Sequence, residues 1–332
     1  MICSTVRPAS GCVSVEGRDN CAPERREVLT TRKGLLLGDS RVLSGSDDDQ
    51  IGRYCSWHLP AFTRFTTGEH RVTRPEPQFL SVGAGAERRE IAVLTQAGKG
   101  PPVVWLGGLR SDMRATKAEA LAAWAERAGR AFIRFDYAGH GESSGDFAQW
   151  TMSHWIEDAQ AVLAAHTQRP AVLVGSSMGG WVALLTTLRL RQSASQLRPA
   201  GLVLIAPAVD FTEELMWAQM PEAVRETIAK DGVWQRPSEY SPEPMPITRA
   251  LIEDGRRHLL FGRPIETGCA VHILQGMKDP DVPYGQALKL VEHLPHDPVV
   301  LTLIKDGDHR LSTPDDIERL VTAVAGVVPA TA

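Results

Sequence analysis

The pattern of apolar positions changes near residue 75. Residues 1–74 show no sustained period and are rich in Arg, Ser, Gly and Asp, with three aspartates in a row at 47–49. A segment without a periodic apolar face cannot bury enough surface to offset its ordering entropy. We predict that residues 1–74 are a poorly ordered N-terminal segment and that residues 75–332 form one folded domain.

Short apolar runs alternate with amphipathic stretches in the second region. The runs predict strands at residues 90–94, 102–106, 131–135, 171–174, 201–205, 271–274 and 299–304. Helical spacing predicts helices at residues 115–130, 152–165 and from 177 to about 191. A last helix starts with Thr313 as N-cap and Pro314 in the first turn. This alternation is typical of parallel βαβ units, so the predicted class is α/β with a mostly parallel, doubly wound sheet.

One interval breaks the alternation. Residues 206–269 contain three helical pieces (212–220, 221–230 and 247–261) and a Pro-rich bridge at 237–246, with no clear strand. An insertion of this length between late strands predicts a helical cap at about residues 207–269. Such a cap would cover the carboxyl edge of the sheet, where open α/β folds bind ligands.

A G-x-S-x-G motif spans residues 175–179, with Ser177 at its centre. The motif places a serine on a sharp turn between a strand and a helix, and both flanking elements are predicted here. Ser176 does not fit the motif, because Val174 stands where a glycine is needed. A plain strand-to-helix turn of small residues is the alternative. We predict that Ser177 is a nucleophile.

A serine nucleophile needs a base, and the base needs an acid to orient it. His309 follows the strand at 299–304 and is the predicted base, while His140, in a Gly-rich loop after a strand, is its main rival. Asp279 follows the strand at 271–274 and is the predicted acid, with Asp281 as the competitor. The chain order Ser177, acid, base is the order of the α/β-hydrolases.

Two backbone N–H groups are needed to stabilise the oxyanion of a tetrahedral intermediate. One is predicted at Met178, the residue after the nucleophile. The other is predicted at Leu109, in the Gly107-Gly108-Leu109 turn after the strand at 102–106, with the N–H of Gly108 as the alternative.

Several stretches resemble a known family. The sequences IRFDYAGHGESSG, VGSSMGGW, DGVWQRPSEYS, HILQGMKDPDVP and DGDHR make residues 76–327 similar to the α/β-hydrolase superfamily, and within it to the abhydrolase domain-containing protein ten family of mitochondrial acyl-protein thioesterases. The resemblance implies a triad of Ser177, Asp279 and His309. It also implies hydrolysis of acyl thioesters on protein cysteines and of acyl-glucuronide esters. Residues 1–74 have no counterpart, and Gly107 stands where many relatives carry a histidine.

The residues and the resemblance together predict a serine hydrolase that cleaves carboxylic esters or thioesters through an acyl-enzyme on Ser177. The alternative is a C–C bond hydrolase or a peptidase with the same triad. A binding protein without activity is disfavoured, because all three triad residues are present. Trp217, Met220 and Leu260 of the cap are predicted to contact an acyl chain, although packing of the cap explains each of them as well.

Charge and composition narrow the partners. Net charge is −4, from 36 basic and 40 acidic residues, so no basic excess is present for binding nucleic acid. The expected partner is a small-molecule ester or an acylated protein, and the oligomeric state is open. The charge-free stretch at 170–188 has a Gly-Ser cluster in its middle, so a membrane span is not predicted.

No cofactor or metal is expected. The five cysteines form no C-x-x-C pair, and Cys55 with His58 has ligand-like spacing but lacks a second pair. No dinucleotide fingerprint is visible. The odd cysteine count and the absence of an apolar leader at the N-terminus predict a cytoplasmic protein.

Overall fold

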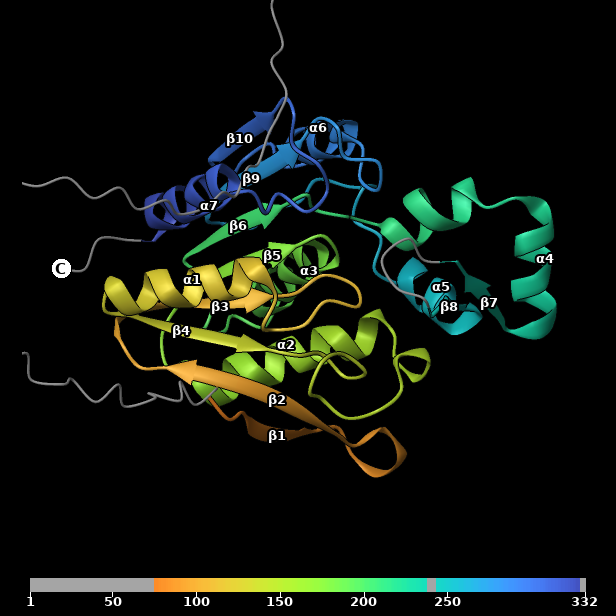
Figure 1. The fold of residues 1–332 in the computed structure, drawn as a ribbon, viewed down its shortest axis with the longest axis horizontal. Helices are drawn as coiled ribbons and strands as arrows, with labels where there is room; N and C mark the ends of the chain where they lie inside the picture. The colour runs from red at the N-terminus through yellow and green to blue at the C-terminus, as the bar shows by residue number, and fades with distance from the viewer. Residues whose placement is uncertain (1–74, 238–242, 329–332) are drawn as a thin grey trace, which may run out of the picture. The chain divides into compact units, whose positions relative to one another are not determined.

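The computed structural model describes residues 75–237 and 243–328, and its centre is an eight-stranded sheet (Figure 1). The strand order is β1-β2-β4-β3-β5-β6-β9-β10. Strand β2 runs antiparallel to both of its neighbours, β1 and β4, and the remaining pairs are parallel. The strands are β1 (Gln78–Val82), β2 (Arg89–Gln96), β3 (Lys99–Leu106), β4 (Arg130–Phe135), β5 (Val172–Ser176), β6 (Gly201–Ile205), β9 (Ala270–Gly276) and β10 (Val299–Ile304).

Helices cover both faces of this sheet, because side chains of each strand alternate between the two faces. Val103 and Trp105 of β3 pack with α1 and α7, whereas Val104 and Leu106 pack in the core with α2, α3 and α6. The helices are α1 (Thr116–Arg127), α2 (Met152–His166), α3 (Met178–Gln192), α6 (Tyr284–Glu292) and α7 (Pro314–Val327). The predicted mostly parallel, doubly wound sheet is confirmed.

The N-terminus of α7 forms as its sequence predicts. The side chain of Thr313 accepts a hydrogen bond from the backbone N–H of Asp316, and the Asp316 carboxylate accepts one from the backbone N–H of Thr313. Pro314 occupies the first turn, where its missing N–H costs nothing. Outside the segment between β6 and β9, one strand and one α-helix were not predicted. The edge strand β1 is largely exposed, so it lacks an apolar run, and α6 follows the β9 loop within a short, mixed stretch.

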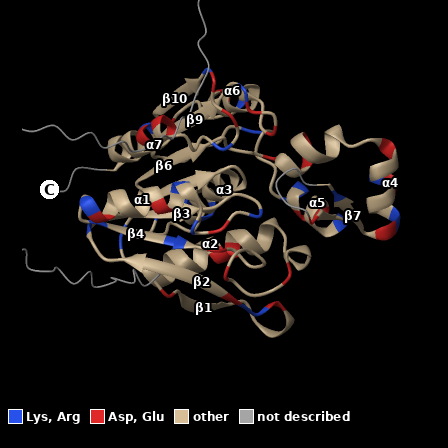
Figure 2. Ribbon diagram, in the orientation of Figure 1, with Lys and Arg blue, Asp and Glu red and all other residues tan. Residues whose placement is uncertain are grey.

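The charge-free stretch at residues 170–188 forms β5 and most of α3. The first ten residues of α3 are buried, and the interior strands β5 and β6 carry no charged side chain (Figure 2). The stretch is apolar because most of its residues are buried inside the protein. Among the helices of the described part of the chain, none has the length and apolar character needed to span a membrane.

The segment between β6 and β9 forms a small lobe beyond the carboxyl ends of the parallel strands (Figure 1). Its elements are η3 (Thr212–Met216), η4 (Trp217–Gln219), α4 (Glu222–Asp231), β7 (Val233–Arg236), β8 (Met245–Thr248) and α5 (Arg249–Arg256). From the sequence, no strand was predicted in this segment. That prediction is wrong, since β7 and β8 pair in antiparallel fashion. Each is only four residues long, too short to show a period of two.

The start of α5 also differs from the prediction. Helix was expected from residue 247, but Ile247 belongs to β8, and Thr248 caps the helix by accepting a hydrogen bond from the N–H of Leu251 at 3.1 Å. Part of the Pro-rich bridge lies outside the described residues. So do the N-terminal segment at 1–74 and, within it, Cys55 and His58, so the predictions made for them stay predictions.

Helix α5 fastens the cap to α2. The Asp254 carboxylate accepts hydrogen bonds from the backbone N–H and the hydroxyl of Ser153, both at 2.7 Å. Burial alone would raise the pKa of Asp254, but hydrogen bonds from His258 and Ser153 outweigh it and hold that pKa well below its usual range. The carboxylate therefore remains charged and keeps the two helices joined.

A buried ion pair joins the sheet to α2. The guanidinium of Arg89 on β2 donates to the Asp158 carboxylate at 2.6 Å, and both side chains are fully buried. The second carboxylate oxygen of Asp158 accepts the N–H of Ala138, in the loop after β4, at 3.0 Å. Arg89 also contacts Glu157 at 2.7 Å, but half of the Glu157 side chain is exposed.

This pair gives a matched test of stability. Asp158→Ala should lower the free energy of unfolding by about 3–5 kcal/mol, because it leaves the buried Arg89 charge without its buried partner. Glu157→Ala removes the exposed partner of the same arginine and should cost about 1 kcal/mol or less. Urea unfolding followed by circular dichroism measures both. Equal costs for the two variants would contradict the assignment of the buried pair as the stabilising one.

Candidate active site

Ser177 lies on the turn between β5 and α3 in a strained backbone conformation, with φ +53° and ψ −118°. The turn brings backbone segments very close together. A Cβ on Gly175 would lie 2.3 Å from the carbonyl oxygen of Gly179, and one on Gly179 would lie 2.1 Å from the carbonyl oxygen of Leu106. Both glycines of the G-x-S-x-G motif are therefore required by the space around the serine.

The two adjacent serines have different surroundings. Ser176 is the last residue of β5, is buried and pairs with Ile205 of β6. Ser177 carries its hydroxyl out of the sheet, where Oγ lies 3.1 Å from Nε2 of His309. The structure thus places Ser177, and not Ser176, at the imidazole.

Three parallel strands of the sheet bring together the residues predicted as a triad. Ser177 follows β5, Asp279 follows β9 and His309 follows β10, and all three loops leave the same edge of the sheet. On the imidazole of His309, Nε2 faces the serine, and Nδ1 lies 2.8 Å from Oδ2 of Asp279. The hydrogen-bonded chain from hydroxyl to imidazole to carboxylate is unbroken.

The Asp279 carboxylate is buried and held in a fixed position. Its Oδ1 accepts the backbone N–H groups of Asp281 at 2.9 Å and Val282 at 2.8 Å. The side-chain amide of Gln275, at the end of β9, donates to Oδ2 at 3.2 Å. These donors orient the carboxylate toward Nδ1 of His309, and Gln275 is a supporting residue for which the sequence carried no signal.

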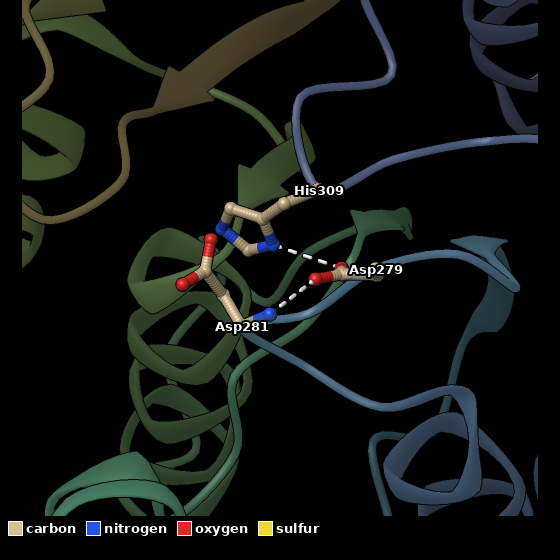
Figure 3. Close-up of side chains that lie close together, drawn as sticks. All are labelled: Asp279, Asp281 and His309. Atoms are coloured by element: carbon tan, nitrogen blue, oxygen red, sulfur yellow. Dashed lines mark hydrogen bonds and ion pairs between the residues drawn. The ribbon is translucent and has the colours of Figure 1, made fainter. Parts of the chain in front are cut away.

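Asp281 lies on the solvent side of the same imidazole. In Figure 3 its carboxylate points along the ring edge that carries Nε2, while Asp279 faces Nδ1. One oxygen of each carboxylate and one ring nitrogen of His309 lie within 4.8 Å of one another. Within residues 75–237 and 243–328 these three form the one group with the spacing for a metal ion. The hydrogen bond between Asp279 and Nδ1 already uses two of the possible ligand atoms.

The two predicted oxyanion donors belong to segments that lie next to Ser177. Met178 is the first residue of α3, and the loop with Leu109 passes over the serine, since a Cβ on Gly108 would lie 3.4 Å from Cβ of Ser177. The pairing of Leu106 with Gly175 sets this register. Within the described residues the N–H groups of Met178, Leu109 and Gly108 have no protein acceptor.

The loop that carries His309 is fixed from two sides. The Asp308 carboxylate accepts the N–H groups of Arg310 at 3.0 Å and Leu311 at 2.9 Å. From α1, the ammonium of Lys117 donates to the carbonyl of Arg310. Burial lowers the pKa of Lys117 to about 8. Lys117 is distant in sequence from the triad, and no motif could have identified it.

His140, the rival base, lies in the core. Its Nδ1 is 3.1 Å from the carbonyl oxygen of Ala138, and its ring packs edge-on against Phe147 and Trp155. Burial lowers the pKa of His140 to about 4, so the imidazole is neutral at pH 7. Its contacts are those of a packing residue.

The three predicted acyl contacts pack within the cap. Leu260 is 1% exposed and donates its N–H to the Asp210 carboxylate at 2.9 Å, and Met220 is also buried. Trp217 is half-buried, with the guanidinium groups of Arg225 and Arg256 over its ring at 5.6 and 4.8 Å. These contacts are those of the alternative interpretation, in which the cap residues pack the cap itself.

Comparisons with known proteins agree with this fold. Residues 103–245 match the family described as serine aminopeptidase, S33. The chain is 33% identical over 232 residues to the Bos taurus protein named palmitoyl-protein thioesterase ABHD10, mitochondrial, a match that covers 70% of this chain and 74% of that protein.

Two solved structures extend the likeness. A putative hydrolase from Agrobacterium vitis S4 is 50% identical, with a TM-score of 0.75, over 77% of this chain and 100% of that chain. Mouse alpha/beta hydrolase domain-containing protein 10 is 31% identical, with a TM-score of 0.68, over 76% and 98% of the two chains. The predicted fold, the resemblance and the prediction of an enzyme are confirmed.

The predicted cytoplasmic location is wrong. The curated ABHD10 relatives are mitochondrial by name, which points to mitochondria rather than the cytoplasm. The prediction depended on the odd cysteine count and on the absence of an apolar leader. Mitochondrial targeting segments are amphipathic and Arg-rich and have no such leader, so its absence could not exclude that location.

The identity and the coverage therefore decide the family: this chain belongs to the α/β-hydrolases, as a relative of ABHD10, and is an enzyme of the hydrolase class.

Proposed function

We propose that this protein hydrolyses carboxylic esters or thioesters through an acyl-enzyme on Ser177. The observation that carries the proposal is the hydrogen-bonded chain from Ser177 Oγ to His309 Nε2, at 3.1 Å, and from His309 Nδ1 to Asp279, at 2.8 Å. In this arrangement the imidazole can take the serine proton, and the carboxylate fixes the tautomer that does so.

In the acylation half, Ser177 Oγ attacks the acyl carbon while its proton moves to His309 Nε2. The charge that develops on the carbonyl oxygen is stabilised by the N–H of Met178 and that of Leu109 or Gly108. Each such donor contributes roughly 3 kcal/mol to transition-state stabilisation. The imidazolium then protonates the leaving oxygen or sulfur, and the bond between that atom and the acyl carbon breaks.

In the second half, water replaces the leaving group. His309 Nε2 accepts a proton as the water oxygen attacks the acyl carbon of the ester on Ser177. The same two N–H groups stabilise the second oxyanion, and the serine departs with the proton returned to it. Asp279 keeps its charge throughout and stabilises the imidazolium that forms in both halves.

The related proteins support the proposed substrate class, and one of them also favours an alternative function. ABHD10 is named a palmitoyl-protein thioesterase, which supports an acyl thioester on a protein or a related acyl ester. The match to the serine aminopeptidase family favours peptide hydrolysis as the second candidate. Thioester, peptide and C–C bond hydrolysis would all use the same serine chemistry. The three reactions therefore differ in their leaving group.

A substrate panel tests the proposal. Purified protein should hydrolyse p-nitrophenyl esters and acyl thioesters with kcat/KM at least about 100-fold above that for aminoacyl p-nitroanilides, because an amine is a poorer leaving group than a thiol or a phenol. Acyl chains from two to sixteen carbons give the preferred length. Faster cleavage of the anilides would contradict ester hydrolysis and favour the peptidase.

The nucleophile can be tested with its neighbour as control. Ser177→Ala should abolish labelling by a fluorophosphonate probe and lower kcat by on the order of 10⁴ or more, while circular dichroism stays unchanged. Ser176→Ala removes the hydroxyl of the preceding serine and should keep most of the labelling. Loss of labelling in Ser176→Ala alone would show that the turn presents the other serine.

The acid can be tested with a second matched pair. Asp279→Asn should lower kcat on a neutral short ester by up to roughly 10⁴, because the carboxamide favours the wrong imidazole tautomer. Asp281→Asn makes the same change in charge two residues away and should cost far less. Steady-state kinetics with circular dichroism as a folding control is sufficient. A larger loss in Asp281→Asn would transfer the role of the acid to Asp281.

A further inference from the structure

Two adjoining cavities lie between the C-terminal half of α3 and the chain that follows α5. Their volumes are about 250 and 260 Å³, and both are lined by Leu188, Gln192 and Arg263. Arg189 of the first cavity comes twelve residues after Ser177. At about 1.5 Å per residue, it therefore lies roughly 18 Å further along the helix axis than the serine. The proposed mechanism uses no side chain of either cavity.

Arginine side chains carry most of the charge in both cavities. Arg189, Arg257 and Arg263 line the first cavity, and Arg191 and Arg263 line the second. Among the described lining residues, Glu266 is the one acid, and its carboxylate lies 3.8 Å from the Arg191 guanidinium in the second cavity. The lining of the first cavity is therefore strongly positive.

Two of these arginines have a weak partner or none. Arg189 is half-buried, and its guanidinium contacts the amide oxygen of Gln160 at 3.5 Å, which is long for a hydrogen bond. Burial lowers the pKa of Arg189, although the guanidinium stays charged at pH 7. The Arg263 side chain is exposed and makes no hydrogen bond or ion pair in the part of the chain that the structure describes. An anion that contacts both would replace the water that Arg189 has lost.

Two acidic side chains near Arg189 are engaged elsewhere. Asp254 and Glu157 attract the Arg189 guanidinium electrostatically, but neither lines a cavity. The Asp254 carboxylate contacts Arg257 at 3.1 Å, and that of Glu157 contacts Arg89 at 2.7 Å. Part of the positive charge of the first cavity is therefore not in contact with a carboxylate of residues 75–237 or 243–328.

Aliphatic side chains form much of the remaining lining. They are Leu185, Leu188 and Leu259 in the first cavity and Leu188, Leu260, Pro264 and Ile265 in the second. An apolar cavity of about 150 Å³ is large enough to hold benzene, so each of these has room for a small organic group. A guanidinium binds carboxylate or phosphate oxygens through paired hydrogen bonds. A ligand that suits both kinds of lining has an anionic head group on an aliphatic chain.

We propose that the two cavities form a binding site for a small anionic amphiphile, with its carboxylate or phosphate head group at Arg189 and Arg263 and its chain along the leucine side chains. The site goes beyond the proposed hydrolysis and does not depend on it. Leu188 and Arg189 belong to α3, whereas Leu259 and Arg263 follow α5. A bound ligand therefore contacts both a helix packed on the sheet and the end of the cap.

Isothermal titration calorimetry with eight-carbon probes tests the site. Octanoate carries a carboxylate, octyl phosphate carries a phosphate, and octanol carries no charge. At low salt the wild-type protein should bind at least one of the two anions about tenfold or more tightly than octanol. It should also bind octyl phosphate more tightly than inorganic phosphate, which lacks the chain. The tighter anion identifies the head group, and about 0.5 M NaCl should weaken its binding.

Substitutions assign the binding to these cavities. Arg263→Gln should raise the Kd of the tighter anion on the order of tenfold, and Arg263→Lys should recover part of that loss because it keeps the charge. Arg127→Gln is the matched control, since it removes the same charge from α1 on the opposite face of the sheet, and it should leave the Kd unchanged. Leu259→Ser should weaken the binding of octyl phosphate but not that of inorganic phosphate.

The outcomes are distinct. An unchanged Kd in Arg263→Gln overturns the proposal, because the anion then binds elsewhere, for example at the triad. An equal rise in Arg127→Gln also overturns it, because the effect is then one of net charge. Octanol that binds as tightly as the anions excludes a role for the arginines and overturns it as well. None of these measurements requires hydrolysis, so a protein inactive on the whole substrate panel overturns the proposed function alone.

Discussion

The close passage of the chain from β5 into α3 is the constraint on which the site depends. Two backbone segments approach so closely at Gly175 and Gly179 that no side chain fits, and Ser177 between them adopts a strained conformation. Such strain persists only where the surrounding structure enforces it. Here the buried strands and the enclosed α3 do so, since both pack in the main core and leave the turn no room to relax.

The parallel sheet then brings the remaining groups to that turn. Neighbouring parallel strands end at the same edge, so loops far apart in the sequence meet there. The loop after β3 lies against Ser177 through the pairing of β3 with β5, and the loops after β9 and β10 supply the carboxylate and the imidazole. Each loop is in turn fixed by its own hydrogen bonds, as those to Asp279 and Asp308 show.

Two aspartates two residues apart have opposite surroundings because of one short turn. The backbone N–H groups of Asp281 and Val282 donate to the Asp279 carboxylate, and this carboxylate is buried next to the imidazole. The same turn directs the Asp281 side chain out to solvent on the far edge of the ring (Figure 3). Position in the turn, and not residue type, therefore separates the buried carboxylate that is hydrogen-bonded to His309 from the exposed one.

The sequence by itself determined the sheet, most helices and the candidate site, because these depend on local periodicity and on a motif whose glycines have one steric reason. It predicted the cap from an interrupted pattern but not β7 and β8, whose four-residue strands form through their pairing with each other. It left His140 as a rival base and Asp281 as a rival acid. Only the tertiary structure showed that His140 is enclosed among aromatic rings, that Lys117 of a distant helix donates to Arg310, and that His309 has one carboxylate on each edge. The reason is that burial and contacts depend on segments far apart in the sequence, and a local pattern carries no information about them.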